Sequence, residues 1–248
     1  MNLDFKDQIA VVTGGASGIG RAVAGALAEA GARVAVLDRD AAGAESTCSE
    51  LGPQHAAFEV DLLDRAAIQA VGADVVAGLG VPDVVVNAAG WDIIENFLDN
   101  SREYWDRVVG INLMGPIEVS RVFLEAMVER GRGGRIVNVA SDAGRVGSSG
   151  EVVYAGAKGG VISFGKALAR EMARHQITVN TVCPGPTDTP LFRSQPEKMQ
   201  EALVRAIPMR RLARPAEVAA AIVFFASSAA SFTTGQVVSV SGGLTMAG

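Results

Sequence analysis

Three side chains in the middle of the chain have the types needed to move a proton: Ser141, Tyr154 and Lys158. The last two stand four residues apart in Tyr-Ala-Gly-Ala-Lys, so a helix places them on one face, one turn apart. A free tyrosine hydroxyl loses its proton near pH ~10, which is too high for a base at neutral pH. One positive charge at about 4 Å favours the phenolate by roughly 4 kcal/mol at an effective dielectric constant of 20, or roughly three pKa units. The pattern therefore predicts a tyrosine that acts as an acid or base near pH 7.

A glycine-rich turn lies far upstream of these residues, in Thr-Gly-Gly-Ala-Ser-Gly-Ile-Gly at positions 13–20. It follows an apolar run at 9–12 and opens a helix predicted over 19–30. Gly14, Gly18 and Gly20 allow the backbone to turn tightly and to approach a pyrophosphate at the helix N-terminus, where free N–H groups favour an anion. The turn predicts a dinucleotide-binding site.

Asp38 ends the second predicted strand, 18 residues after Gly20. A carboxylate at this position accepts hydrogen bonds from the adenosine ribose and repels a 2′-phosphate, which favours NAD over NADP. Two alternatives stay open, since Arg39 could attract that phosphate and Asp38 could simply begin the turn. Asp61, at the end of the third predicted strand, is a candidate for holding the adenine amino group or for capping the next helix.

Short β-branched runs alternate with helical segments along the whole chain, which indicates a parallel sheet covered on both faces. We expect one Rossmann-type, doubly wound α/β domain over residues 1–248, with long helices over 104–130 and 152–173. The stretch 189–214 has little core pattern of its own and predicts a lid over the carboxyl ends of the strands. The seven predicted strands are 9–12, 33–38, 56–61, 84–87, 135–139, 177–182 and 236–240.

Composition argues against several other classes of protein. A formal net charge of −5 disfavours a nucleic-acid-binding surface. Residues 218–248 carry no charge, but the apolar part of this segment, 218–230, is too short to span a bilayer and predicts a buried helix. Cys48 and Cys183 lie far apart without metal-ligand spacing, which predicts free thiols and no metal site. With no secretory signal visible at the start, we expect a soluble, cytoplasmic protein.

Together these residues resemble the short-chain dehydrogenase/reductase family, and the resemblance covers essentially the whole chain. Further matching elements are Asn112, Pro184-Gly185 and Asn87-Ala88-Ala89-Gly90, where the family usually reads Asn-Asn-Ala-Gly. The resemblance implies a hydride transfer to or from a nicotinamide cofactor, with four catalytic residues: Asn112, Ser141, Tyr154 and Lys158.

Each of these four residues has an implied role. Tyr154 is the general base of the oxidation, and Ser141 hydrogen-bonds the substrate oxygen. Lys158 lowers the pKa of the tyrosine and holds the nicotinamide ribose. Asn112 holds a water that links Lys158 to solvent, although an asparagine within a helix can also simply bond back to its own backbone.

The resemblance also implies how NAD is bound. Backbone near Pro184-Gly185 and Thr187, with the hydroxyl of Thr189, is expected to hold the carboxamide. The complete expected set is Gly14, Ser17, Gly18, Ile19, Gly20, Asp38, Asp61, Leu62, Asn87, Ala88, Gly90, Tyr154, Lys158, Pro184, Gly185, Thr187 and Thr189.

Three segments, 87–93, 141–151 and 182–189, resemble a narrower group, the 2-hydroxycyclohexanecarboxyl-CoA dehydrogenases. This implies oxidation of a cyclic β-hydroxyacyl-CoA in the breakdown of alicyclic and aromatic acids. The alternatives are a 3-oxoacyl-thioester reductase, a dehydrogenase of a free cyclic alcohol, and, from another class, a non-catalytic nucleotide-binding subunit. A non-catalytic subunit is expected to have lost part of the Asn-Ser-Tyr-Lys set, which is complete here.

Substrate contacts and partners are expected from less specific features. The lid carries arginines at 205, 210, 211 and 214, which form either a solvated charged face or a contact with the phosphates of a CoA thioester. The helix over 152–173 has more apolar surface than one sheet contact needs, which favours a homotetramer. The candidate substrate residues are Trp91, Arg145, Ser148, Ser149 and Arg210.

Overall fold

The apolar runs form strands that are buried on both faces. Every residue of β1 (Ile9–Thr13), β4 (Val84–Asn87) and β6 (Ile177–Pro184) is buried, as a central strand of a parallel sheet requires. The other strands are β2 (Arg33–Asp38), β3 (Ala56–Glu59), β5 (Gly134–Val139) and β7 (Val237–Val240). The computed structural model describes residues 3–247, so three terminal residues of the expected domain lie outside the described residues.

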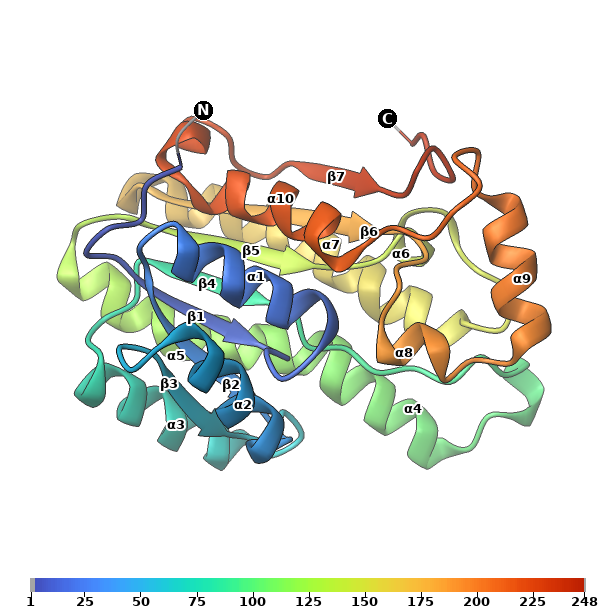
Figure 1. The fold of residues 1–248 in the computed structure, drawn as a ribbon, viewed down its shortest axis with the longest axis horizontal. Helices are drawn as coiled ribbons and strands as arrows, with labels where there is room; N and C mark the ends of the chain where they lie inside the picture. Colours follow the sequence, from blue (N-terminus) through green and yellow to red (C-terminus); the bar gives the residue numbers. More distant parts are fainter. Residues whose placement is uncertain (1–2, 248) are drawn as a thin grey trace.

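These seven strands form one parallel sheet in the order β3-β2-β1-β4-β5-β6-β7 (Figure 1). Helices cover both of its faces, which confirms the predicted Rossmann-type α/β fold. The chain first builds β1, β2 and β3 toward one edge and then returns to place β4 on the other side of β1. At such a reversal the connections after neighbouring strands diverge, and they leave a crevice at the carboxyl ends of β1 and β4.

Two apolar layers hold the helices to the sheet. On one face, α1 (Gly18–Glu29), α2 (Ala41–Leu51) and α10 (Pro215–Ala226) pack on the strands through side chains such as Leu27 and Ile222. On the other face, α3 (Arg65–Gly78), α5 (Gly115–Arg130) and α7 (Val152–Met172) do so through Ile68, Phe123 and Ala169 among others.

The segment 218–248, which carries no charged residue, contains the buried helix that its composition predicts. Its apolar part forms α10, whose side chains at 218, 219, 222, 223, 225 and 226 are buried against the sheet and α1. None of the helices within residues 3–247 combines the length and apolar content needed to cross a membrane. Cys48 and Cys183 are both buried free thiols, as predicted.

The helical stretch predicted over 104–130 is present, but it is interrupted by a π-helical turn. The segment consists of α4 (Arg102–Val109), a π-helical turn η2 (Gly110–Met114) and then α5. The side-chain amide of Asn112 donates to the carbonyl of Val108, four residues back, and to the carbonyl of Trp91 on the loop after β4. A side chain that competes for backbone groups in this way is a known cause of helix irregularity, and π turns often mark functional sites.

The predicted lid contains short helices rather than an open loop. It includes α8 (Pro190–Arg193) and α9 (Glu197–Ala206), which lie beyond the carboxyl ends of the strands (Figure 1). Phe192, Gln195 and Ile207 are buried and attach the segment to the rest of the domain. The remaining short elements are η1 (Phe97–Asp99), α6 (Ala143–Val146), η3 (Ala173–His175) and η4 (Ser228–Ala230).

Candidate active site

A cavity of about 720 Å³ occupies the crevice at the carboxyl ends of the strands. Its walls come from the segments that follow β1, β2, β3, β4, β5 and β6, together with the lid and the C-terminal residues Leu244 and Thr245. Parallel strands end on the same edge of a sheet, which explains how residues from one end of the sequence to the other line one cavity.

The glycine-rich turn forms one end of the cavity. Gly14 has a left-handed backbone (φ 70°), and a Cβ there would lie 2.7 Å from the Cα of Ala89. A Cβ on Gly20 would lie 2.1 Å from the carbonyl oxygen of Gly14, so the turn closes only because both residues are glycine. Ser17 precedes α1 and makes no capping hydrogen bond within residues 3–247, which leaves backbone N–H groups at the helix start for an anion.

Two carboxylates stand where an adenosine would lie next to this turn. Asp38 is the last residue of β2 and lines the cavity, with its Oδ2 accepting from the backbone N–H of Ala16 (3.0 Å) and its Oδ1 from that of Asp40 (3.0 Å). Asp61 also lines the cavity, and its Oδ1 accepts from the N–H of Leu63 (2.9 Å). These bonds hold both side chains at the rim of the cavity.

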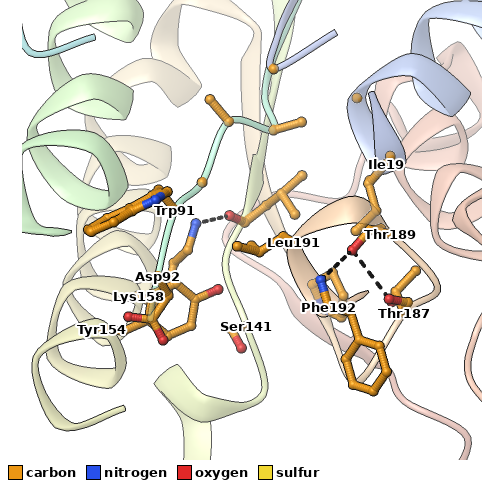
Figure 2. Close-up of a pocket in the computed structure, with 18 of the residues that line it drawn as sticks. Ile19, Trp91, Asp92, Ser141, Tyr154, Lys158, Thr187, Thr189, Leu191 and Phe192 are labelled. Atoms are coloured by element: carbon orange, nitrogen blue, oxygen red, sulfur yellow. Dashed lines mark hydrogen bonds between the residues drawn. The ribbon is translucent and has the colours of Figure 1, made fainter. Parts of the chain in front are cut away.

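The segment after β6 lies against the glycine-rich turn, where Thr189 is next to Ile19 (Figure 2) and a Cβ on Gly18 would lie 3.2 Å from the Thr189 side chain. The hydroxyl of Thr187 donates to the carbonyl of Gly185 (2.9 Å), and that of Thr189 donates to the carbonyl of Thr187 (3.3 Å). Thr189 also caps α8 by accepting from the N–H of Phe192 (3.2 Å). Pro184, Gly185, Thr187 and Thr189 therefore all line the cavity, as predicted for a cofactor-binding segment.

Ser141, Tyr154 and Lys158 meet at the other end of the cavity (Figure 2). Tyr154 and Lys158 project from successive turns of α7, with the lysine Nζ 5.7 Å from the centre of the tyrosine ring. The Nζ of Lys158 donates to the carbonyl of Val139, the last residue of β5 (2.9 Å). Gly144 in α6 allows α7 to approach, since a Cβ there would lie 2.7 Å from the backbone of Lys158. The sequence-predicted triad is thus brought together.

Burial shifts the proton affinities of this pair away from their ordinary values. Burial, reinforced by the charge of Glu151, raises the pKa of Tyr154, while a hydrogen bond with Ser141 acts in the lowering direction. Burial also lowers the pKa of Lys158 to about 8. Burial thus opposes the phenolate in the protein alone, and a pKa of Tyr154 lowered by Lys158 together with the charge of an oxidised nicotinamide stays a prediction.

Asn87 and Asn112 were predicted to belong to the site, but their side chains bond to neighbouring residues behind the cavity wall. Asn87 donates from Nδ2 to Asn138 (2.8 Å) and Ser120 (3.0 Å), which places its amide in the core between β4, β5 and α5. Asn112 clamps the loop after β4, since its Oδ1 accepts from the N–H of Trp91 (3.2 Å) and its Nδ2 donates to the Trp91 carbonyl (2.7 Å). Neither side chain lines the cavity. We therefore correct the expectation that the Asn87 side chain contacts the cofactor, whereas the role of Asn112 in holding a water stays a prediction.

The candidate substrate residues divide into two groups. Trp91 and Ser148 line the cavity, and the Arg107 guanidinium, 4.1 Å from the centre of the Trp91 ring, holds that ring in place. Arg145 instead turns to the C-terminal segment, where it donates to Ser239 (2.9 Å) and to the carbonyl of Ala247.

Ser149 and Arg210 also lie outside the wall of the cavity. Both are exposed, and the Arg210 guanidinium contacts the carbonyl of Arg205. Arg145 and Ser149 therefore do not line the cavity where a substrate would bind, while contact of Arg210 with the phosphates of a CoA stays a prediction. Arg210 nevertheless lies on the lid, where a long substrate could emerge from the cavity.

Several cavity residues had not been predicted, because nothing in the local sequence marks them. Asp92 and Glu151 lie near Tyr154, and Gln195 from the lid accepts from the N–H of Ile94 (3.2 Å), which joins the lid to the loop after β4. Others are Val146, Leu191, Phe192, Leu203, Leu244 and Thr245.

The shape of the cavity and the hydrogen-bonding groups in its wall fit a dinucleotide. At one end, Gly14 and Gly20 leave no room for a Cβ, and the backbone N–H groups at the start of α1 are available to a pyrophosphate. The carboxylate of Asp38 stands at the end of β2, next to this turn. At the other end lie the hydroxyls of Ser141 and Tyr154 and the side chain of Lys158. Every residue expected to bind NAD lines the cavity except Asn87. Among residues 3–247, no cluster of three or more His, Cys, Asp or Glu side chains is placed to hold a metal ion.

Comparisons with known proteins match nearly the full length of the chain. The family model described as enoyl-(acyl carrier protein) reductase matches residues 14–245. The chain is 39% identical over 255 residues to the (3R)-3-hydroxyacyl-CoA dehydrogenase of Mus musculus, covering 98% of each protein. It is 36% identical over 246 residues to the 3-oxoacyl-[acyl-carrier-protein] reductase of Vibrio cholerae, covering 99% of this chain and 100% of the relative.

One solved structure extends the match to three dimensions. The crystal structure of a 3-ketoacyl-(acyl-carrier-protein) reductase from Brucella melitensis in complex with NADH superposes with a TM-score of 0.93 at 32% identity, covering 98% of this chain and 100% of the other. Sequence and fold therefore agree on the same group of proteins.

Proposed function

The chain belongs to the short-chain dehydrogenase/reductase family of oxidoreductases, and we propose that it oxidises a secondary alcohol of a β-hydroxyacyl-CoA thioester with NAD. The observation that carries this proposal is the convergence of Ser141, Tyr154 and Lys158 at one end of a cavity whose other end is a glycine cradle. A hydride donor and a hydride acceptor fit side by side in such a cavity, next to a group that takes the proton.

The proposed chemistry divides between the cofactor and the protein. When bound, oxidised nicotinamide supplies the hydride acceptor and one positive charge. The hydroxyl of Ser141 donates to the substrate oxygen and stabilises the charge that develops on it. Tyr154 as phenolate takes the hydroxyl proton, and Lys158 favours that phenolate and is placed to hold the nicotinamide ribose. The raised pKa of Tyr154 in the protein alone indicates that the phenolate needs more positive charge than Lys158 provides.

We predict that the enzyme prefers NAD+ over NADP+ because Asp38 stands at the ribose position. kcat/KM with NAD+ should exceed that with NADP+ by at least about tenfold, since an unpaired carboxylate facing a phosphate costs more than about 1.4 kcal/mol. Steady-state rates with each cofactor measure the ratio, and Asp38→Asn should reduce it. Equal activity with both cofactors would instead assign Arg39, which also lines the cavity, as a phosphate ligand.

The substrate class rests on two kinds of support. The (3R)-3-hydroxyacyl-CoA dehydrogenase of Mus musculus is among the similar proteins, and the segments 87–93 and 141–151 resemble dehydrogenases of a cyclic hydroxyacyl-CoA. We therefore propose 2-hydroxycyclohexanecarboxyl-CoA as the type of substrate. The runner-up is reduction of a 3-oxoacyl thioester, which the similarity to the Vibrio cholerae and Brucella melitensis reductases favours.

Within the lid, Arg210 is the best candidate to contact the phosphates of a CoA. Arg211 and Arg214 pair with Glu217 (2.7 and 3.3 Å), and Arg205 pairs with Glu201 (3.4 Å). Arg210 makes no ion pair with an acidic residue in the described part of the chain, and it is exposed. An unpaired guanidinium near the end of the cavity is suited to a phosphate.

We predict that the CoA ester of 2-hydroxycyclohexanecarboxylic acid is oxidised with a kcat/KM at least about tenfold above that of the methyl ester, because binding energy from a remote handle positions the reacting ring. NADH formation by the purified enzyme measures both rates. Arg210→Ala should raise KM for the CoA ester, more at low salt, and leave the methyl ester unaffected. Arg211→Ala, which removes an arginine already paired with Glu217, serves as the control. Equal values for the two esters would discard the thioester class and retain the dehydrogenase.

We also propose that the enzyme is cytoplasmic and assembles as a homotetramer. Exposed apolar side chains at Phe232, Val238 and Met246, in the charge-free C-terminal segment, support association with other copies.

A further inference from the structure

A buried carboxylate lies next to the catalytic tyrosine without a full set of partners. Asp92 is 4% exposed and lines the cavity beside Tyr154 and Lys158 (Figure 2). Its Oδ1 accepts from the hydroxyl of Tyr104 (2.7 Å), but its Oδ2 has no hydrogen-bond partner within residues 3–247. An unpartnered buried carboxylate is costly, so its position in the cavity wall calls for a functional reason.

Glu151 adds a second negative charge at the same place. It precedes α7 and lines the cavity, and the charges of both Glu151 and Asp92 act to raise the pKa of Tyr154. Burial, reinforced by Glu151, raises the pKa of Asp92 to about 7, against the lowering effect of the Tyr104 hydrogen bond. The wall at this end therefore becomes more negative as the pH rises through about 7 and Asp92 loses its proton.

The groups around Asp92 provide little positive charge in return. Tyr104 contacts it from α4, and Tyr154 and Lys158 face it from α7. Glu95, on the same loop, adds a further negative charge that acts on Tyr104. Lys158 is the one cation from the described residues that lines this end, and its Nζ is engaged by the carbonyl of Val139.

The other cationic side chains of the region do not line this end of the cavity, and Arg107 packs over the Trp91 ring at 4.1 Å without lining the cavity. Arg145 is turned toward Ser239 and Ala247, and Arg39 lines the opposite end of the cavity, next to Asp38. A substrate group bound next to Ser141 and Tyr154 therefore meets carboxylates and no free guanidinium from the described part of the chain. An anionic group is repelled here, whereas a neutral group is not.

We propose that Asp92 and Glu151 act as a charge filter, which excludes substrates with a free carboxylate beside the reacting carbinol and admits neutral esters and thioesters. In a β-hydroxy acid the carboxyl carbon lies two bonds from the carbinol carbon, so it cannot avoid this end of the cavity once the hydroxyl reaches Tyr154. The filter rests on the proposed function for the identity of its substrate. It explains how the enzyme selects a thioester over the free acid independently of any contact with CoA.

A methyl ester is neutral like a thioester but carries no CoA, so comparing it with the free acid tests the effect of charge alone. We expect kcat/KM for methyl 2-hydroxycyclohexanecarboxylate to exceed that for the free acid in the wild-type enzyme. Asp92→Asn keeps the size and the acceptor for Tyr104 but removes the charge, and it should reduce the ester-to-acid ratio by about fivefold or more, the effect of one unit charge a few ångströms away. Glu151→Gln should reduce the ratio in the same direction.

A matched control and the pH dependence distinguish a filter from a structural role. Glu95→Gln removes a carboxylate from the same loop at an exposed position outside the cavity wall, and it should leave the ratio unchanged. Because Asp92 loses its proton as the pH rises through about 7, the wild-type ratio should increase between about pH 6 and 8. In Asp92→Asn this increase should be absent.

The same measurements are made with 3-hydroxybutyrate and its methyl ester, so that the ratio is obtained for a second carbon skeleton. Where a free acid is oxidised too slowly to measure, its inhibition constant against oxidation of the ester is compared between variants instead of its kcat/KM. A ratio that stays at the wild-type value in both Asp92→Asn and Glu151→Gln overturns the filter. Equal rates for methyl and CoA esters, with a ratio that still responds to Asp92→Asn, would reject the thioester proposal and leave the filter standing.

Discussion

Tyr154→Phe is expected to lower kcat by a factor of about 10² or more, the usual scale for loss of a general acid or base. The substitution removes one hydroxyl and leaves the ring, which packs against its neighbours in the wall of the cavity. The hydroxyl of Ser141 keeps its own partner, since it accepts from the N–H of Ala143 (3.1 Å). Stability and cofactor binding should therefore survive while turnover is lost.

Three measurements check this expectation. Thermal unfolding should give the wild-type midpoint, and NADH titration followed by fluorescence should give the wild-type affinity. Steady-state oxidation rates should then isolate the loss to the chemical step. A variant that keeps more than about a tenth of the wild-type kcat would require another residue as the base.

The effect of Ser141→Ala tests whether the two hydroxyls act together. In the proposed mechanism both groups act on the same substrate oxygen, so either substitution alone should remove most of the catalysis. The double variant Ser141→Ala/Tyr154→Phe should then be only slightly slower than Tyr154→Phe, because residues that act as a unit are not additive. Losses that multiply would show that the serine and the tyrosine act in separate steps.

The fold was predictable because its determinants are local. The central strands appear as apolar runs rich in β-branched residues, and the runs that lead to Gly14, Asp38 and Asn87 end at a residue that begins the next connection. Residues at these ends must share one edge of the sheet, which is why Gly14, Asp38 and Ser141 line the same cavity. Tyr154 and Lys158 required only that their segment be helical.

Long side chains were not predictable in the same way, because tertiary partners decide where they point. Arg145 is next to the catalytic segment in sequence, yet its partners are Ser239 and Ala247, far along the chain. Asp92 shows the reverse case, since nothing in Trp-Asp-Ile indicates that the carboxylate is buried against Tyr104. The upward effect of burial on the pKa of Tyr154 was not predictable for a related reason, because charge spacing can be inferred from a sequence but depth of burial cannot.

Lys158→Met is expected to reduce kcat by about 10²-fold or more and at the same time to stabilise the cofactor-free protein. The activity is lost because the ammonium that favours the phenolate of Tyr154 is gone. The stability is gained because Lys158 is 2% exposed and burial lowers its pKa to about 8, so folding at neutral pH places a charged group in an unfavourable site. A residue needed for catalysis is thus costly for folding.

The pH dependence of this gain follows from proton binding. Between about pH 8 and 10.4 the unfolded chain holds a proton on Lys158 that the folded chain has released, so the wild-type protein gains stability as the pH rises through this window. Below pH 8 the full penalty of about 3 kcal/mol applies. Loss of the hydrogen bond to the Val139 carbonyl offsets about 1 kcal/mol of it, which leaves about 2 kcal/mol in favour of Lys158→Met at pH 7.

Thermal unfolding at pH 7 and near pH 10 tests this expectation. Lys158→Met should unfold about 5 °C higher than the wild-type protein at pH 7, and the difference should shrink toward zero near pH 10. Lys166→Met, on an exposed position of the same helix, should change neither stability nor kcat. A Lys158→Met protein that unfolds at a lower temperature than wild type at pH 7 would show that the ammonium is stabilised by its surroundings. In that case the burial of Lys158 would carry no cost in stability, and such a cost would have no part in how the site works.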